Sequence, residues 1–132
     1  AEGGFGDKRA SGGIAGFRAM LRALREGKSL MLTGEVPPTP GRIVAPGIIA
    51  VARLSGRPII PVGIASTRQK IIERLWDRMQ VNYPFGTMFV VSAPPIRVAK
   101  DDDEAEAAQA VKAALDGAYE AAMLRAAAAR RR

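Results

Sequence analysis

The sequence contains no cysteine and no histidine among its 132 residues. The missing cysteine excludes disulfides, thiolate metal sites and cysteine nucleophiles, and it leaves the redox compartment unconstrained. The missing histidine removes the usual general base near neutral pH and the commonest metal ligand in proteins. Any enzymatic function must therefore operate without histidine or take it from elsewhere.

Long apolar runs are also missing. Pro46, Arg53 and Arg57 interrupt the most apolar third of the chain, so no run reaches the roughly 18 residues that a membrane-spanning helix needs. No signal peptide is recognisable either. The sequence begins with Ala1 and not with Met, which is consistent with a start partway through a longer product.

Positive charge is what the sequence has in excess. Lys and Arg number 20 against 13 Asp and Glu, which gives a formal net charge of +7. Such a balance favours an anionic partner, whether a phospholipid surface, a nucleic acid or a phosphorylated substrate. Nucleic acid is the least favoured, because the arginines are dispersed and only four Phe, two Tyr and one Trp are available for base stacking. We therefore expect no nucleic-acid partner.

Three segments have the features of helices. Apolar residues at spacings of three and four lead up to Gly27, a plausible C-cap, and Pro46 and Gly56 bracket a second helix. A third, long helix over 101–129 begins with aspartates and ends with arginines, both of which match the helix dipole. Its narrow buried face is predicted to consist of Val111, Leu115, Ala118 and Ala122. Residues 125–132 form a basic tail that we expect to fray.

Apolar runs between these helices predict strands. "SLMLT" (29–33) and "RPIIPVGIAST" (57–67) are continuous apolar runs, and residues 87–92 give a third strand, whereas 71–79 predict one or two helical turns. Alternating helices and strands with short connections are the pattern of a parallel α/β sheet. We therefore predict a single α/β domain over residues 1–132, with a mostly parallel sheet, flanking helices and a long C-terminal helix.

A single acid, Glu35, stands in a loop rich in proline and glycine directly after the first predicted strand. Beyond the carboxyl edge of a parallel sheet, where ligands bind in open α/β folds, such a carboxylate can accept a hydrogen bond from a substrate hydroxyl. Pro37 and two further prolines stiffen the loop, which suits a positioned group. A solvated surface acid is the alternative, and the position taken alone favours it.

A second candidate for ligand binding lies near the start of the chain. Residues 1–13 hold five glycines and are predicted to be a loop, with Lys8 and Arg9 just before the first helix. Backbone amides at a helix N-terminus and a guanidinium group can together bind a phosphate. A mobile basic terminus is the alternative.

Three of the seven aromatic residues fall close together, at Trp76 and in "NYPFG" (82–86). Tyr and Trp favour interfaces, so this cluster could face a membrane or a substrate. A small apolar core beneath a long loop is the more common outcome for such a cluster.

Several segments then follow one another in a distinctive order: "GGIAGFRAMLRALREGKSLMLTGEVP", "GRIVAPGIIAVARLSGRPIIPVGIAST", "WDR", "NYPFG" and "PPIRV". This order resembles the lysophospholipid acyltransferase superfamily. The most similar branch is the bacterial one long carried as a domain of unknown function, in which the third motif reads like T-A-D-V-P or T-P-D-G-P. The similarity extends over about residues 8–98 and covers the later part of that domain.

In that superfamily, an upstream H-x-x-x-x-D motif supplies a His that activates the acceptor hydroxyl and an Asp that orients the His. This chain has no histidine, so the resemblance implies no catalytic residue within it. Either the chain is the C-terminal part of an acyltransferase domain, or it is a non-catalytic relative.

The resemblance does imply a set of substrate-binding residues, namely Arg9, Thr33, Gly34, Glu35, Pro37 and Pro61. Arg9 looks like the basic residue of the second motif, which in some members contacts the phosphate of the acceptor. Glu35 stands where the third motif, implicated in acceptor binding, has its acid. Gly34 departs from the T-P-D-G-P form, although Val36 suits the T-A-D-V-P variant. Pro61 matches the fourth motif, whose apolar strand is thought to shape the acyl site.

The function implied by this resemblance is transfer of a fatty acyl group to the hydroxyl of a lysophospholipid or related lipid. Acyl-CoA or acyl carrier protein would be the donor substrate, and we expect no cofactor and no metal. We expect a location at the cytoplasmic face of the bacterial inner membrane, either peripheral or anchored by a segment not in this chain, and the +7 charge favours docking at an anionic surface. The alternative is a non-catalytic lipid-binding or scaffold module. The oligomeric state is left open.

Overall fold

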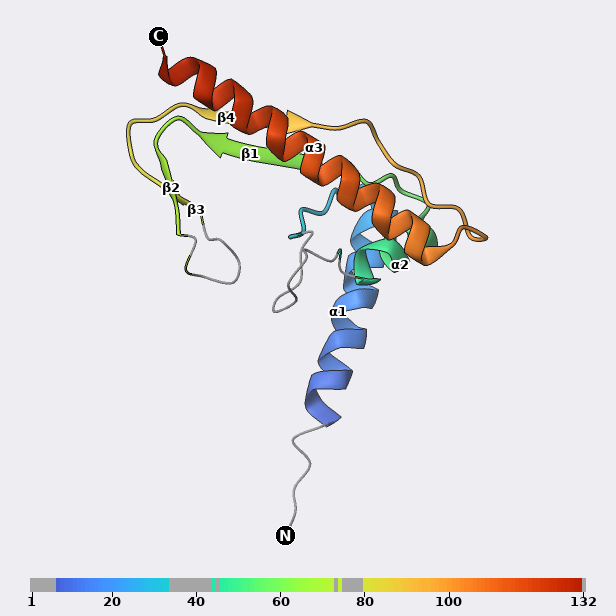
Figure 1. The fold of residues 1–132 in the computed structure, drawn as a ribbon. Helices are drawn as coiled ribbons and strands as arrows, with labels where there is room; N and C mark the ends of the chain where they lie inside the picture. Colours follow the sequence, from blue (N-terminus) through green and yellow to red (C-terminus); the bar gives the residue numbers. More distant parts are fainter. Residues whose placement is uncertain (1–6, 34–43, 45, 73, 75–79, 132) are drawn as a thin grey trace.

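The computed structural model describes residues 7–33, 44, 46–72, 74 and 80–131 (Figure 1). These residues form three helices and four strands, in the chain order α1 (Asp7–Arg25), α2 (Pro46–Ser55), β1 (Val62–Ser66), β2 (Gln69–Ile71), β3 (Gln80–Asn82), β4 (Met88–Ser92) and α3 (Glu104–Arg130). Helix α3 lies along the β1–β4 pair, and α2 packs near its N-terminal end (Figure 1). Helix α1 contacts α2, and its N-terminal half extends away from the other elements (Figure 1).

The strands form one long hairpin that is bent in the middle. Strand β1 pairs antiparallel with β4, and β2 pairs antiparallel with β3. Beyond β1 and β4, Ile59 and Ile96 exchange two backbone hydrogen bonds of 2.8 Å, which lengthens the hairpin. The predicted parallel sheet is therefore wrong: each pair formed by the described strands is antiparallel. A hairpin joins its strands through its own turn and needs no helical crossover.

The bend arises because the two sides of the hairpin have different lengths. Ser66 pairs with Met88 and Gln69 pairs with Asn82, so residues 67–68 on one side face residues 83–87 on the other. Surplus residues on one strand produce a bulge and a local kink, as extra residues in a β-ladder do generally. We call residues 83–87 the corner loop.

Helix α3 covers one face of the β1–β4 pair with small side chains. Ala65 of β1 packs with Ala122 and Ala126 of α3 in a buried cluster, and Phe89 and Val91 pack against its edge. On the opposite face of β4, Met88 and Val90 are exposed, as the two-residue alternation of a strand requires. A continuous apolar run such as 57–67 is typical of a strand covered on both faces, whereas α3 covers one face of β1.

A second buried cluster joins α2 to the N-terminal half of α3. Its fully or nearly fully buried members are Val44, Ile49, Ala52, Val98 and Val111. Arg53 of α2 donates a 2.9 Å hydrogen bond to the backbone oxygen of Asp102, just before α3 begins. Asp103 then caps α3, because its carboxylate accepts from the backbone amides of Ala105 and Glu106.

The predicted helices are confirmed, with their ends shifted. Gly27 and Gly56 have φ values of 84° and 68°, the left-handed conformation that a glycine adopts at low cost after a helix C-terminus. Helix α1 begins at Asp7, so the loop predicted over residues 1–13 is wrong from residue 7 onward. Helix α3 continues to Arg130, through most of the segment expected to fray.

Two further predicted elements, the strand at 29–33 and the helical turns at 71–79, differ from the structure where it describes those residues. Residues 29–33 form no strand, and Met31 is 85% exposed, although their apolar character predicted a buried strand. Of the helical turns predicted over 71–79, Ile71 belongs to strand β2 instead, and residues 73 and 75–79 lie outside the described part of the chain.

We expect substitution of Gly63→Ala to destabilise the fold. A Cβ atom at this position of β1 would fall well inside van der Waals contact with the backbone of Ala118 and Tyr119 in α3. Because backbone atoms cannot move aside like a side chain, the free energy of unfolding should fall by at least about 2 kcal/mol, as measured by urea denaturation.

Gly117→Ala is the matched control for this prediction. The same added methyl group at Gly117 of α3 meets nothing within 4 Å. Alanine also favours helix over glycine by about 0.5–1 kcal/mol, so this variant should be slightly more stable than the parent. Equal stability of the two variants would contradict the close approach at Gly63.

Candidate functional site

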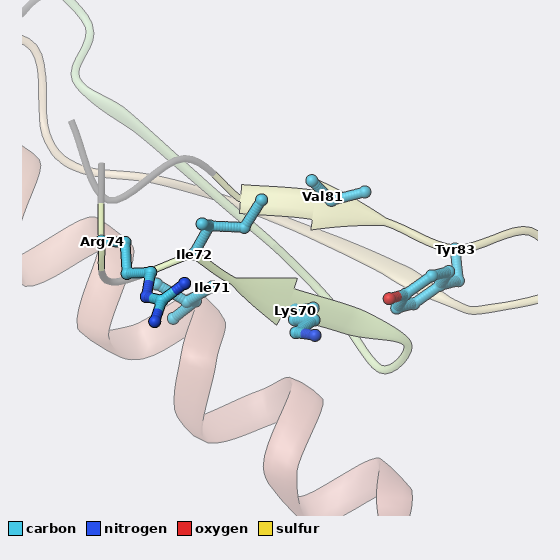
Figure 2. Close-up of a pocket in the computed structure, with 6 residues that line it drawn as sticks. All are labelled: Lys70, Ile71, Ile72, Arg74, Val81 and Tyr83. Carbon is cyan, nitrogen blue, oxygen red and sulfur yellow. The ribbon is translucent and has the colours of Figure 1, made fainter. Parts of the chain in front are cut away.

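An open hollow of about 660 Å³ lies on the β2–β3 part of the hairpin (Figure 2). It is lined by Lys70, Ile71, Ile72, Arg74, Val81 and Tyr83. The side chains of Ile71, Ile72 and Val81 are half-buried, whereas those of Lys70 and Arg74 are exposed. The hollow therefore combines an apolar floor with a positively charged rim.

The hairpin register determines how these residues come together. Lys70 pairs directly with Val81, so the two side chains project from the same face of the β2–β3 pair. Tyr83 directly follows β3, and its backbone amide donates a 2.8 Å hydrogen bond to the carbonyl oxygen of Arg68. In Figure 2 the phenol ring of Tyr83 extends from the end of β3 toward β2. The hollow is thus built from both sides of the hairpin.

The chemical character of the hollow is that of a site for an anionic amphiphile. Lys70 and Arg74 can each donate charge-assisted hydrogen bonds to a phosphate or carboxylate, and the Tyr83 hydroxyl can donate one more. The aliphatic floor can contact the first methylene groups of an alkyl chain. Its volume is within the range of pockets that hold small organic ligands.

Of the residues predicted to bind substrate, the structure describes the side chains of Thr33 and Pro61, and neither lines the hollow. Gly34, Glu35 and Pro37 are outside the described residues. Thr33 is exposed, and residues 29–33, which precede that loop, form no strand. Arg9 lies within helix α1, and its side chain is outside the described part of the molecule. The described residues thus give no geometry for the acceptor loop.

Pro61, like Thr33, is a predicted site residue that the structure describes. It lies just before β1, is among the most buried side chains, and its carbonyl oxygen accepts a 2.9 Å hydrogen bond from the amide of Ala93. In this position Pro61 packs in the interior and helps to pair the two sides of the hairpin. It does not line the hollow.

The described residues hold no group of three or more acidic side chains that could bind a metal ion. Nor is any helix among residues 7–33, 46–72 and 80–131 long and apolar enough to cross a membrane.

Sequence reasoning missed the hollow because it assigned residues 71–79 to helical turns. The signal that could have revealed it is the β-branched pair Ile71 and Ile72 after a polar stretch, matched by Gln80, Val81 and Asn82 beyond the "WDR" segment. Two short strand-like runs around a polar connection indicate a hairpin. Each run alone is too short to show the two-residue period of a strand, so the sequence favours a helical interpretation.

Comparison with known proteins adds one relative of undefined function. The chain is 26% identical over 88 residues to an uncharacterized protein of Rickettsia prowazekii (strain Madrid E), a match that covers 67% of this chain and 40% of the relative. The chain thus spans about two fifths of the length of that relative. No known family profile matches the chain. No solved structure matches it either.

Proposed function

We propose that this chain is the lipid-binding part of an acyltransferase that transfers a fatty acyl group from acyl-CoA or acyl carrier protein to the hydroxyl of a lysophospholipid or related lipid. The hollow on β2 and β3 is the observation that supports lipid binding best, because a cationic rim over an apolar floor matches the two halves of such a molecule. The order of motifs that resembles the lysophospholipid acyltransferases supports the reaction class.

The reaction itself needs a group that this chain does not contain. In direct acyl transfer the acceptor hydroxyl loses its proton and attacks the thioester carbonyl, and the thiol of the donor leaves. The sequence has no histidine to accept that proton. The proposed part played by these residues is therefore to bind and orient the lipid, with the base supplied by a preceding H-x-x-x-x-D segment.

A non-catalytic lipid-binding module is the second candidate. It is favoured by the same absence of histidine and by the antiparallel hairpin, which differs from the predicted parallel sheet. Both candidates share the hollow and differ only in turnover. Separate tests of binding and of transfer therefore distinguish them.

We expect the hollow to bind a monomeric lysophosphatidic acid with a ten-carbon chain, as measured by isothermal titration calorimetry. Lys70→Ala should raise the dissociation constant about fivefold, since one exposed charge-assisted hydrogen bond contributes about 1 kcal/mol. The double variant Lys70→Ala/Arg74→Ala should weaken binding further. A monoacylglycerol of the same chain length, which carries no phosphate, should bind weakly to the parent and be insensitive to both changes.

Lys100→Ala is the matched control, because it removes an exposed lysine that does not line the hollow. Its dissociation constant should stay within about twofold of the parent value, as expected for a distant surface charge. If Lys100→Ala weakens binding as much as Lys70→Ala, the affinity reflects overall charge and the hollow is not the site.

Transfer is tested on the polypeptide purified from its native source, with its intact mass and N-terminal sequence determined first. If an H-x-x-x-x-D segment is present, we expect labelled acyl groups to pass from acyl-CoA to lysophosphatidic acid. Glu35→Ala should lower the rate about tenfold or more, because a group that orients the acceptor acts on the transition state. The 132-residue chain alone should bind lipid without turnover, since it has no histidine.

Glu26→Ala serves as the control for Glu35→Ala, since it removes another acid, one that pairs with Lys28 at 2.7 Å on the surface. A transfer rate unaffected by Glu35→Ala would exclude that residue from the acceptor site. Normal lipid binding without transfer by the native polypeptide would favour the non-catalytic module.

A further inference from the structure

The corner loop exposes an aromatic side chain, Phe85, that does not line the hollow. Phe85 is 94% exposed, the largest exposure among the exposed large apolar residues of the described chain. Its φ of 63° is the left-handed conformation, which is uncommon for an aromatic residue. Tyr83 and Phe85, the described aromatic residues of the predicted cluster, are thus exposed and form no small apolar core, while Trp76 lies outside the described residues.

The corner loop is held in place by hydrogen bonds on both sides of Phe85. Before it, the Arg68 guanidinium donates to the carbonyl oxygen of Pro84 at 3.3 Å. After it, Thr87 donates its amide to the Thr67 hydroxyl and accepts from the Thr67 amide, both at 2.9 Å. The exposure of Phe85 is therefore a property of a braced loop and not of a free end.

The opposite side of the bend is also fixed. The Arg130 guanidinium of α3 donates to the carbonyl oxygens of Thr67 and Ser66. Ser66 is almost completely buried, and its amide donates a 2.7 Å hydrogen bond to the Gln69 side chain. The last turn of α3 and the bend thus support the loop that carries Phe85.

The surroundings of Phe85 are positively charged and partly apolar. Arg68 and Lys70 are exposed on the adjacent side of the hairpin. The sequence from Arg78 to Lys100 contains no acidic residue at all. Met88, which directly follows the corner loop, is 56% exposed. An aromatic and apolar tip with cations beside it is the pattern of a peripheral membrane contact.

We propose that the corner loop inserts Phe85 into the interfacial region of an anionic phospholipid bilayer while Arg68 and Lys70 contact the lipid headgroups. The net charge of +7 makes an anionic bilayer the complementary partner. The tip is a site of attachment that adjoins the hollow, with which it shares Lys70 and Tyr83, whereas Phe85 does not line the hollow. This inference goes beyond acyl transfer and stands whether or not the chain takes part in catalysis.

The experiment is flotation of the protein with vesicles of phosphatidylcholine mixed with an equal amount of phosphatidylglycerol. Phe85→Ala should weaken binding about tenfold, the factor expected when one aromatic side chain no longer enters an apolar phase. Leu54→Ala is the matched control, because it truncates an apolar residue 57% exposed on α2, away from the bend. That variant should bind as the parent does. Circular dichroism of each variant confirms that it is folded.

Two further measurements separate the aromatic and the electrostatic contributions. In a Trp76→Phe background, Phe85→Trp should show a blue shift of its emission when mixed vesicles are added, and brominated lipids should quench it. Raising the salt from about 0.1 M to about 1 M should weaken binding through the cations, since the Debye length falls from about 10 Å to about 3 Å. Vesicles of phosphatidylcholine alone should bind more weakly than the mixed ones.

Equal vesicle binding by Phe85→Ala and the parent, or no vesicle binding by either, would overturn the proposal. Loss of self-association in Phe85→Ala, with vesicle binding unchanged, would instead assign the tip to contact with a second copy of the chain. Phe85→Ala should leave the binding of monomeric lysophosphatidic acid unchanged. Vesicle flotation thus tests the membrane contact of Phe85, and calorimetry with lysophosphatidic acid tests binding to the hollow.

Discussion

The close approach of helix α3 to strand β1 at Gly63 is the contact on which the rest of the structure depends. No other residue type leaves room there for the backbone of Ala118 and Tyr119. Alanine at positions 65, 122 and 126 continues the same thin contact along the strand. Because the side chains are small, few rotamers have to be ordered when the helix packs, and the entropic cost of this interface is low.

Once β1 is placed against α3, the register of the hairpin places the remaining strands. Strand β4 is aligned by the pairs from Val62 with Ser92 to Ser66 with Met88. The unequal lengths at the bend then force the corner loop outward, and Arg130 holds the bend from the end of α3. The hollow and the exposed Phe85 are therefore both consequences of one bulged hairpin packed on one helix.

The helices could be predicted from sequence because the signals that end a helix are local. Pro46, Gly56 and Gly27 act through their own φ values and through hydrogen bonds to residues within one turn, so they can be recognised without knowing the fold. The buried face of α3 was predicted for a similar reason: Val111, Ala118 and Ala122 lie on one side of a periodic helix. Local rules were sufficient for these elements.

The strand arrangement could not be predicted in the same way, because strand pairing is decided by distant residues. The run at 57–67 is apolar whether its partner is parallel or antiparallel, and the partner that it has begins more than twenty residues further on. Residues 29–33 have a strand-like composition, but they form no strand, and Met31 and Leu32 are exposed. The composition shows which residues are apolar but not which other elements of the fold cover them.

The antiparallel pairing of the strands affects the two proposed lipid-binding regions differently. The hypothesis that Glu35 binds substrate rested in part on a parallel sheet, whose carboxyl edge gathers ligand-binding groups. An antiparallel hairpin has no such common edge. What remains for Glu35 is the resemblance of its motif, which concerns the acceptor alone. The hollow depends on neither premise, since its cations and its apolar floor are brought together by the pairing of β2 with β3. Tyr83 belongs both to the lining of the hollow and to the corner loop, so a lipid bound at the proposed site would lie beside the proposed membrane contact.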